Sequence, residues 1–349
     1  MNNAMNKKKI RNILLAAAGV VALGVLGAAW LWFSDNRRSN FSGRADLYLR
    51  PGATVQDVRA AIPDSIVLRP ASLRRMLRKL QDEDIRPGHY VVGPGNPSVY
   101  VPRMLRGGWQ TPVNLVLSGT MRLKGAIARK VSAQLMVDSA TVHRALEDED
   151  LLATYGFTPD DVFSMILPDT YEMYWTASMK DVFDRLKKAY DTWWTPERKE
   201  KAKLQGLTQR QVSIVASIVS GESHYTPELP KIAGVYLNRY RIGMKLQADP
   251  TVAFCYDYTL NRILLQHLQF DSPYNTYLYE GLPPGPICVP PKECLEAVLN
   301  PDTHGYLYFC ASDAMDGTHR FAVSYADHLR NADAFRRALD ARARKNNAK

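Results

Sequence analysis

The most informative run of the sequence is LTQRQVSIVASIVSGESHY, at residues 207–225. Thr208 followed three positions later by Gln211 fits a capping box, a pattern that opens many helices. Apolar residues then recur at helical spacing up to Glu222. The run therefore predicts a helix that begins after Thr208 and carries Glu222 at its end.

The position of Glu222 on this helix suggests its chemistry. Val219, Ile218 and Val215 lie three, four and seven positions before it, so the carboxyl projects from the apolar face. Burial and the negative end of the helix dipole both favour the protonated form, which raises the pKa toward the range of a general acid. The alternative is that Gly221 ends the helix and Glu222 points to solvent.

Three loop runs with proline, amides and aromatic rings follow this helix. They read LQADPT at 246–251, SPYNTY at 272–277 and GLPPGPI at 281–287. Rigid loops of this composition suit a groove for a polar polymer such as a sugar chain, because rings cover C–H faces while amides bind hydroxyls.

Together these runs resemble a known family. ASIVSGES (216–223), VYLNRYRIGMKLQADPTV (235–252), LPDTY (167–171) and the SPYNTY and GLPPGPI loops resemble the endolytic murein transglycosylases, the MltG/YceG-like proteins. The resemblance implies a single-pass inner-membrane enzyme that cuts nascent peptidoglycan strands internally and leaves 1,6-anhydro-N-acetylmuramic acid ends. The family often reads ASIVEKE, so Ser220 replaces its first glutamate and Glu222 matches the second.

The resemblance also implies the site residues. Glu222 is the expected catalytic acid. For Asp249 and Arg239, the alternatives are that Asp249 caps a turn and that the two pair with each other. His319 and Phe321 also match a family element, with a supporting or packing role as open as substrate contact. The residues expected to line or support the cleft are Asn238, Arg239, Gln247, Asp249, Tyr274, Asn275 and Tyr277.

Other functions remain open at this stage. A muramidase would use Glu222 as acid and a second carboxylate, Asp249 or Asp169, to activate water. A wall-binding scaffold would use Glu222 only structurally. A serine acyl enzyme is set aside, because neither Ser-x-x-Lys nor G-x-S-x-G occurs in the sequence.

An uncharged apolar segment at residues 13–33 is long enough to cross a bilayer, at about 1.5 Å per residue. Lys7, Lys8, Lys9 and Arg11 precede it, which predicts a cytoplasmic N-terminus and a periplasmic remainder. A cleaved signal peptide is the alternative, although its apolar region is usually shorter. We expect a retained single-pass anchor in the inner, cytoplasmic membrane.

Composition and patterning complete the expected organisation. The 349 residues are 46% hydrophobic and 23% charged with a net charge of +10, which excludes disordered and collagen-like chains. The expected class is α+β, with a strand-helix-helix-strand region that resembles a LysM-like peptidoglycan-binding module. An adaptor subdomain of the same topology is the alternative. The expected parts are a cytoplasmic stub (1–12), the anchor (13–33), a linker (34–43), the LysM-like subdomain (44–112) and the catalytic domain (113–349).

No cofactor, metal or nucleic acid is expected. The sequence has no nucleotide-binding glycine motif and no basic run interleaved with aromatic residues. Buried thiols or one disulfide are favoured over a metal for the cysteines at 255, 288, 294 and 310. The expected partners are peptidoglycan strands, the membrane and, by resemblance, peptidoglycan synthases.

Overall fold

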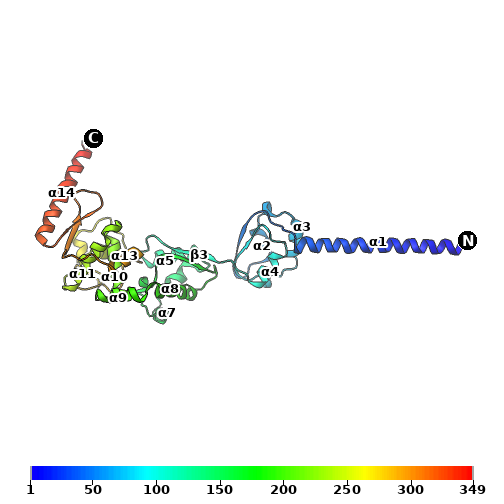
Figure 1. Ribbon diagram of the computed structural model, residues 1–349, viewed down its shortest axis with the longest axis horizontal. Helices are drawn as coiled ribbons and strands as arrows, with labels where there is room; N and C mark the ends of the chain where they lie inside the picture. The colour runs from blue at the N-terminus through cyan, green and yellow to red at the C-terminus, as the bar shows by residue number, and fades with distance from the viewer. Residues whose placement is uncertain (1, 348–349) are drawn as a thin grey trace. The chain divides into compact units, whose positions relative to one another are not determined.

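The computed structural model describes residues 2–347, with side chains from residue 7 to residue 344. The predicted stub and catalytic domain also include residue 1 and residues 348–349, which lie outside the described residues. The chain forms two compact units (Figure 1). Unit 1 comprises the residues up to 113 and Glu172–Thr176, and unit 2 comprises Asn114–Tyr171 and the chain from Ala177 onward.

Unit 1 has the predicted strand-helix-helix-strand order. The strands β1 and β2 pair antiparallel, with Leu47 opposite Tyr90. Alternate residues of β1 are buried and exposed, as the sequence pattern predicts for a strand with one face on a core. The elements are α1 (Asn2–Asn36), β1 (Ala45–Leu49), α2 (Val55–Ala61), η1 (Asp64–Ile66), α3 (Pro70–Leu77), η2 (Asp82–Asp84), β2 (Gly88–Val92) and α4 (Tyr100–Gly107).

Local signals explain these boundaries. Thr54 and Asp57 form a reciprocal capping box that opens α2, and Gly108 ends α4 in the left-handed conformation that glycine adopts without strain. The core beneath the hairpin contains Leu47, Tyr90 and Met104, all fully buried. The predicted α+β class is therefore confirmed for this unit, while the likeness to LysM stays a prediction.

The structure differs from the expected linker at residues 34–43. Ser34 and Asp35 are buried in the last turn of α1, and Phe41 is buried in the core of unit 1. Phe41 also bridges Val67 as in a short antiparallel sheet. The polar composition of the segment reflects hydrogen bonds to unit 1 rather than a solvated connection.

α1 is apolar and exposed along most of its length. In the part of the chain that the structure describes, it is the one helix long and apolar enough to cross a membrane. Its most apolar part is not buried within the protein. The helix thus matches the predicted apolar segment and continues it to Asn36.

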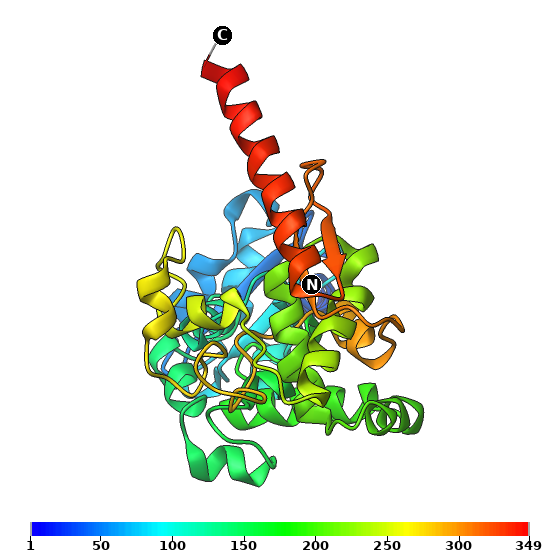
Figure 2. The ribbon, with the colours of Figure 1, turned by 90° about the vertical axis from the view of Figure 1, so that its left-hand side faces the viewer.

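Unit 2 is mostly helical and holds the run at 207–225. Its helices α10, α11 and α13 pack on one another, and α12 packs on α10. Figure 2 shows α14 leaving the body of the unit beside β5 and β6, with which it is in contact. The first elements are β3 (Val113–Leu117), α5 (Lys124–Ser132), α6 (Ser139–Ala145), α7 (Glu149–Thr154), η3 (Val162–Met165), β4 (Asp169–Met173), α8 (Met179–Trp193) and α9 (Pro196–Leu204); Val113 of β3 and the last two residues of β4 are counted with unit 1. The later ones are α10 (Gln209–Glu222), η4 (Thr226–Glu228), α11 (Leu229–Arg241), α12 (Asp249–Cys255), η5 (Leu265–Gln269), α13 (Lys292–Leu299), β5 (Tyr308–Ala311), β6 (His319–Ala322) and α14 (Tyr325–Asn347).

Gly285, in the GLPPGPI loop, allows the chain to approach the segment around Asp160 closely. A Cβ at Gly285 would overlap the backbone carbonyl of Asp160, which cannot rotate away as a side chain can. We expect Gly285→Ala to lower the free energy of unfolding by about 1–3 kcal/mol, the usual cost of overpacking. Thermal unfolding measures this effect. Gly125→Ala is the control, since its nearest neighbour is the flexible end of Arg129 at 3.6 Å, and an equal loss there would contradict the explanation.

Candidate active site

The catalytic helix predicted from the sequence is α10. Thr208 accepts a hydrogen bond from the backbone of Gln211, and the Gln211 side chain accepts one from the backbone of Thr208, so the predicted capping box is confirmed. Residues 212–219 are all buried. The helix runs through Gly221 and ends at Glu222, which places the carboxyl at its C-terminal end.

Glu222 is partly buried and accepts a hydrogen bond from Tyr236 of α11. The hydroxyl Oη of Tyr236 lies 2.5 Å from Oε1 of Glu222. The pKa of Glu222 is raised to about 7, mainly by burial; the negative charge of Asp249 also raises it, while the Tyr236 hydrogen bond and the Arg239 charge lower it. A carboxylic acid with this pKa is still largely protonated just below neutral pH.

The Tyr236 hydrogen bond also distinguishes the two oxygens of Glu222. Burial and the neighbouring Glu222 hold the pKa of Tyr236 well above its usual range, so its hydroxyl stays a donor. With Oε1 accepting this hydrogen bond, Oε2 is the oxygen that is free to carry the acidic proton of neutral Glu222. The arrangement can deliver a proton from a defined atom and take it back there.

Arg239 of α11 is 7% exposed, and its positive charge acts on the Glu222 carboxyl group. It donates from Nε to the Leu307 carbonyl at 2.6 Å and from Nη1 to the Leu246 carbonyl at 2.5 Å. Burial lowers the pKa of its guanidinium. The sequence left open a pairing of Arg239 with Asp249. In the structure Arg239 instead donates to the backbone of two segments, at Leu246 and Leu307, and so connects them.

Asp249 is exposed at the first turn of α12, where it accepts a hydrogen bond from Tyr277 Oη at 2.7 Å. Its negative charge is one of the causes that raise the pKa of Glu222. Gln247, two residues earlier, is exposed with a φ of 49°, a strained value for a residue with a side chain. Asp249 and Glu222 also raise the pKa of Tyr277, so these three side chains are close enough to interact electrostatically.

The amides of Asn238 and Asn275 support the loops of the site. Asn238 donates to the carbonyl oxygens of His304 and Tyr306 at 2.8 and 3.2 Å. Asn275 is fully buried and donates to the carbonyl oxygens of Leu268 and Phe270 at 3.0 and 2.8 Å. Their side-chain NH2 groups are bound to the protein backbone.

Tyr274, His319 and Phe321 lie farther from the carboxyl. The ring of Tyr274 packs on Phe254, with centroids 4.6 Å apart. His319 lies 2.8 Å from Glu228 through Nδ1, and both His319 and Phe321 pack against Phe309, which contacts Tyr236 edge-on. His319 and Phe321 thus back the helix that presents Tyr236.

Tyr236 is the functional residue that the sequence prediction missed. Its spacing from Ile232 and Val235 places it on the apolar face of α11, a position typical of ordinary core residues. A buried tyrosine hydroxyl needs a hydrogen-bond partner, which was the available signal. The sequence did not reveal that the partner would be Glu222, fourteen positions earlier on another helix.

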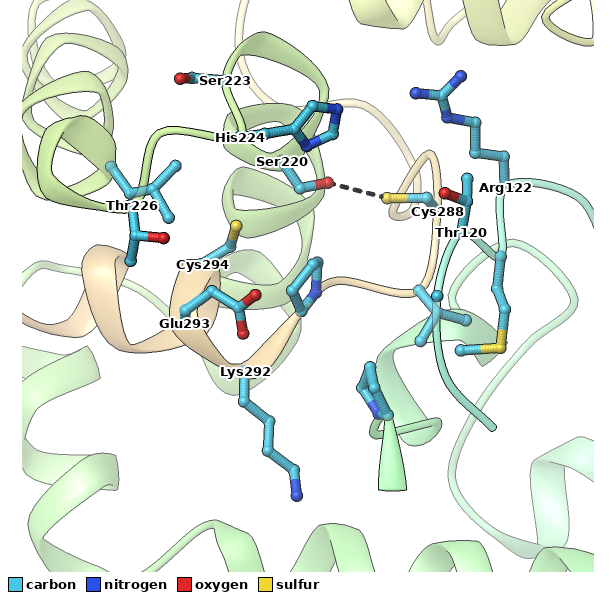
Figure 3. Close-up of a pocket in the computed structure, with 16 residues that line it drawn as sticks. Thr120, Arg122, Ser220, Ser223, His224, Thr226, Cys288, Lys292, Glu293 and Cys294 are labelled. Atoms are coloured by element: carbon cyan, nitrogen blue, oxygen red, sulfur yellow. Dashed lines mark hydrogen bonds between the residues drawn. The ribbon is translucent and has the colours of Figure 1, made fainter. Parts of the chain in front are cut away.

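Ser220 faces away from Glu222, since two residues along a helix correspond to a rotation of about 200°. Its hydroxyl lies 3.3 Å from Cys288 Sγ, on a cavity of about 330 Å³ lined by Ser220, Cys288 and Cys294 among others (Figure 3). All four cysteines are free, and burial raises the pKa of Cys288 to about 11 and that of Cys294 to about 12. These two thiols are therefore uncharged near neutral pH.

Comparison with known proteins identifies the family. The model of the YceG-like family matches residues 47–334, most of the chain. The chain belongs to the YceG-like family. The resemblance seen in the sequence is thereby confirmed, and the match covers both units.

Named relatives are similar over part of their length. The endolytic murein transglycosylase of Bacillus subtilis (strain 168) is 33% identical over 55% of this chain and 48% of that protein. The endolytic murein transglycosylase of Streptococcus pneumoniae serotype 2 is 30% identical over 48% of this chain and 31% of that protein. The chain thus matches less than two thirds of either relative.

A solved structure supports the fold. The crystal structure of a YceG-like protein from Listeria monocytogenes superposes with a TM-score of 0.53, covering 83% of this chain and 99% of that one. At 23% identity this similarity bears on the fold alone.

Proposed function

We propose that this protein is a membrane-anchored endolytic murein transglycosylase. The observation that carries the proposal is Glu222, whose pKa is raised to about 7 and whose Oε1 is bound by Tyr236. Such a group can act first as a general acid and then as a base near neutral pH. The relatives named endolytic murein transglycosylases agree with this chemistry.

The proposed reaction needs one carboxyl group. Oε2 of Glu222 donates its proton to the glycosidic oxygen as the bond to C1 of N-acetylmuramic acid breaks through an oxocarbenium-like transition state. The Glu222 carboxylate then takes the proton of the C6 hydroxyl of the same sugar, whose oxygen bonds to C1. The product is a 1,6-anhydro end, and no water is consumed. Tethering of the nucleophile supplies a large effective concentration.

A muramidase is the second candidate, and Asp249 is the observation that favours it. Asp249 is exposed and its charge acts on Glu222, so it could activate a water molecule. Asp169, the other carboxylate considered, is bound by Lys292 Nζ at 2.6 Å, which lowers its pKa. Of these two carboxylates, Asp249 is therefore the partner that a hydrolase would use.

α1 supports a single-pass anchor in the inner membrane. Its apolar stretch follows Lys7, Lys8, Lys9 and Arg11, which favours a cytoplasmic N-terminus and places both units outside the cytoplasm. The proposed substrate is nascent peptidoglycan. Peptidoglycan synthases act on the same strands and are therefore the proposed protein partners.

Unit 1 is proposed to contribute glycan affinity as a LysM-like module. Tyr48 is half exposed, stacks on His89 at 4.5 Å and meets the edge of Trp175 at 5.2 Å. A fixed tyrosine ring with a free face suits the C–H surface of a sugar.

Mass spectrometry of glycan fragments tests the proposed reaction. The full-length protein in detergent is incubated with peptidoglycan strands, and the ends of the fragments are weighed. We expect internal cuts with anhydro ends, one water lighter than hydrolysis products. Hydrated reducing ends would instead identify a muramidase, and bound but uncut strands would identify a wall-binding scaffold.

A further inference from the structure

The last turn of α1 is built into unit 1. Ser34 and Asp35 are 7% and 4% exposed, whereas Trp30 and Trp32, one turn earlier, are more than half exposed. Aromatic residues of this kind favour the boundary between lipid and water. If α1 crosses a membrane, as proposed above, this end of unit 1 therefore lies at the level of the lipid headgroups.

α3 packs directly against the last turn of α1 (Figure 1). Arg69, before its first turn, donates from Nη1 to the Ser34 carbonyl at 2.6 Å and from Nη2 to the Ser39 carbonyl at 2.8 Å. Arg75 pairs with Asp35 at 2.7 Å. These bonds join α1 and unit 1 without a flexible connection.

Basic side chains gather at the same place. Arg37 and Arg38 follow α1 immediately and are exposed, and Lys79 acts electrostatically on Asp35 as Arg75 does. Burial and the positive charges of Arg38 and Arg75 lower the pKa of Arg69. We name this group the juxtamembrane basic cluster; it consists of Arg37, Arg38, Arg69, Arg75 and Lys79.

The neighbouring carboxylates do not balance this charge. Asp35 is the acidic group bound within the cluster. Of the acidic residues that follow Lys79, Asp82 accepts a hydrogen bond from the backbone of Val55, Asp84 pairs with Arg106, and Glu83 is exposed. The cluster therefore carries an excess of positive charge at the C-terminal end of α1, just after its apolar segment.

We propose that the juxtamembrane basic cluster binds the headgroups of anionic phospholipids and holds unit 1 on the membrane surface. This inference rests on the anchor proposed above and goes beyond it. The exposed guanidinium groups of Arg37 and Arg38 can bind phosphate oxygens, and the others add positive charge. Each basic residue near an anionic bilayer strengthens the attraction by about fivefold. Salt screens this attraction, because exposed charges interact over about one Debye length.

Lipid selectivity in vesicles tests the proposal. The full-length protein is reconstituted, and quenching of Trp30 and Trp32 is compared for brominated phosphatidylglycerol and brominated phosphatidylcholine. We expect stronger quenching by phosphatidylglycerol, reduced in 0.5 M salt, and at least about fivefold lower selectivity in Arg37→Gln/Arg38→Gln. Both side chains are exposed, and the bond to Arg69 uses the backbone carbonyl of residue 38, so the fold should persist.

The matched control is Arg336→Gln/Arg337→Gln, which removes two adjacent exposed arginines from α14, of which Arg336 pairs with Asp333. It should keep the selectivity of the original protein. Equal quenching by the two lipids, or selectivity that survives in the Arg37→Gln/Arg38→Gln protein, would overturn the inference while leaving the anchor intact. Absence of quenching by either lipid would refute the anchor as well.

Discussion

Glu222→Gln is expected to abolish strand cleavage while unit 2 stays folded. Glutamine has the shape of glutamate, and its side-chain oxygen can still accept the Tyr236 hydrogen bond, but it has no acidic proton to donate. General acid catalysis contributes about 10²–10⁴-fold, so kcat should fall by at least that range. The measurement is the rate at which new fragment ends form from peptidoglycan strands.

Thermal unfolding shows whether the variant is folded and tests the burial of Glu222 independently. The folded-state pKa of Glu222 is about 7 and its ordinary value is 4.5, so the unfolded state ionises first as pH rises. The original protein should therefore lose stability between about pH 4.5 and 7, by up to about 3 kcal/mol. Glu222→Gln lacks this loss, and we expect it to melt higher than the original protein at pH 8 but equally at pH 4.5.

Glu293→Gln is the control: it removes a different carboxyl group near the C-terminal end of α10. Glu293 lines the cavity on the Ser220 side of α10. Its neutralisation should leave cleavage unchanged. A Glu222→Gln protein that still cuts strands would remove Glu222 from the acid role, whatever its stability.

The sequence predicted the parts of the site that depend on local spacing. The Thr208 cap, the helix over 209–222 and the carboxyl on its buried face follow from neighbours within seven positions. Pro227 favours the first turn of an α-helix, but residues 226–228 form a 3₁₀ turn (η4) and α11 begins at Leu229. Likewise, α6 and α7 are separate helices, since the Asp148 side chain caps the start of α7.

Contacts between distant segments were beyond sequence reasoning. Arg239 bonds to a carbonyl 68 positions later, and Glu172–Thr176 belongs to unit 1 although the chain around it belongs to unit 2. Periodicity reports which face of an element is buried but not what covers it. For the same reason the polar segment at 34–43 looked like a linker, although Phe41 is buried in the core of unit 1.

Tyr236→Phe and Asp249→Asn should move the alkaline limb of the pH–rate profile in opposite directions. With protonated Glu222 as the acid, kcat/KM falls as pH rises through about 7. The Tyr236 hydroxyl stabilises the carboxylate and lowers the pKa of Glu222, so its removal should move the limb up by about one pH unit. The charge of Asp249 raises that pKa, so the asparagine variant should move the limb down.

The opposite signs distinguish tuning of Glu222 from damage to the fold. A variant that merely loosened the cleft would lower the rate at every pH without moving the limb. Tyr240→Phe, four positions along α11, is the matched control: its hydroxyl accepts a hydrogen bond from Gln211 at 3.3 Å rather than binding Glu222. We expect its profile to match that of the original protein. A limb that stayed in place in Tyr236→Phe would show that the Tyr236 hydrogen bond does not set the proton affinity of the acid.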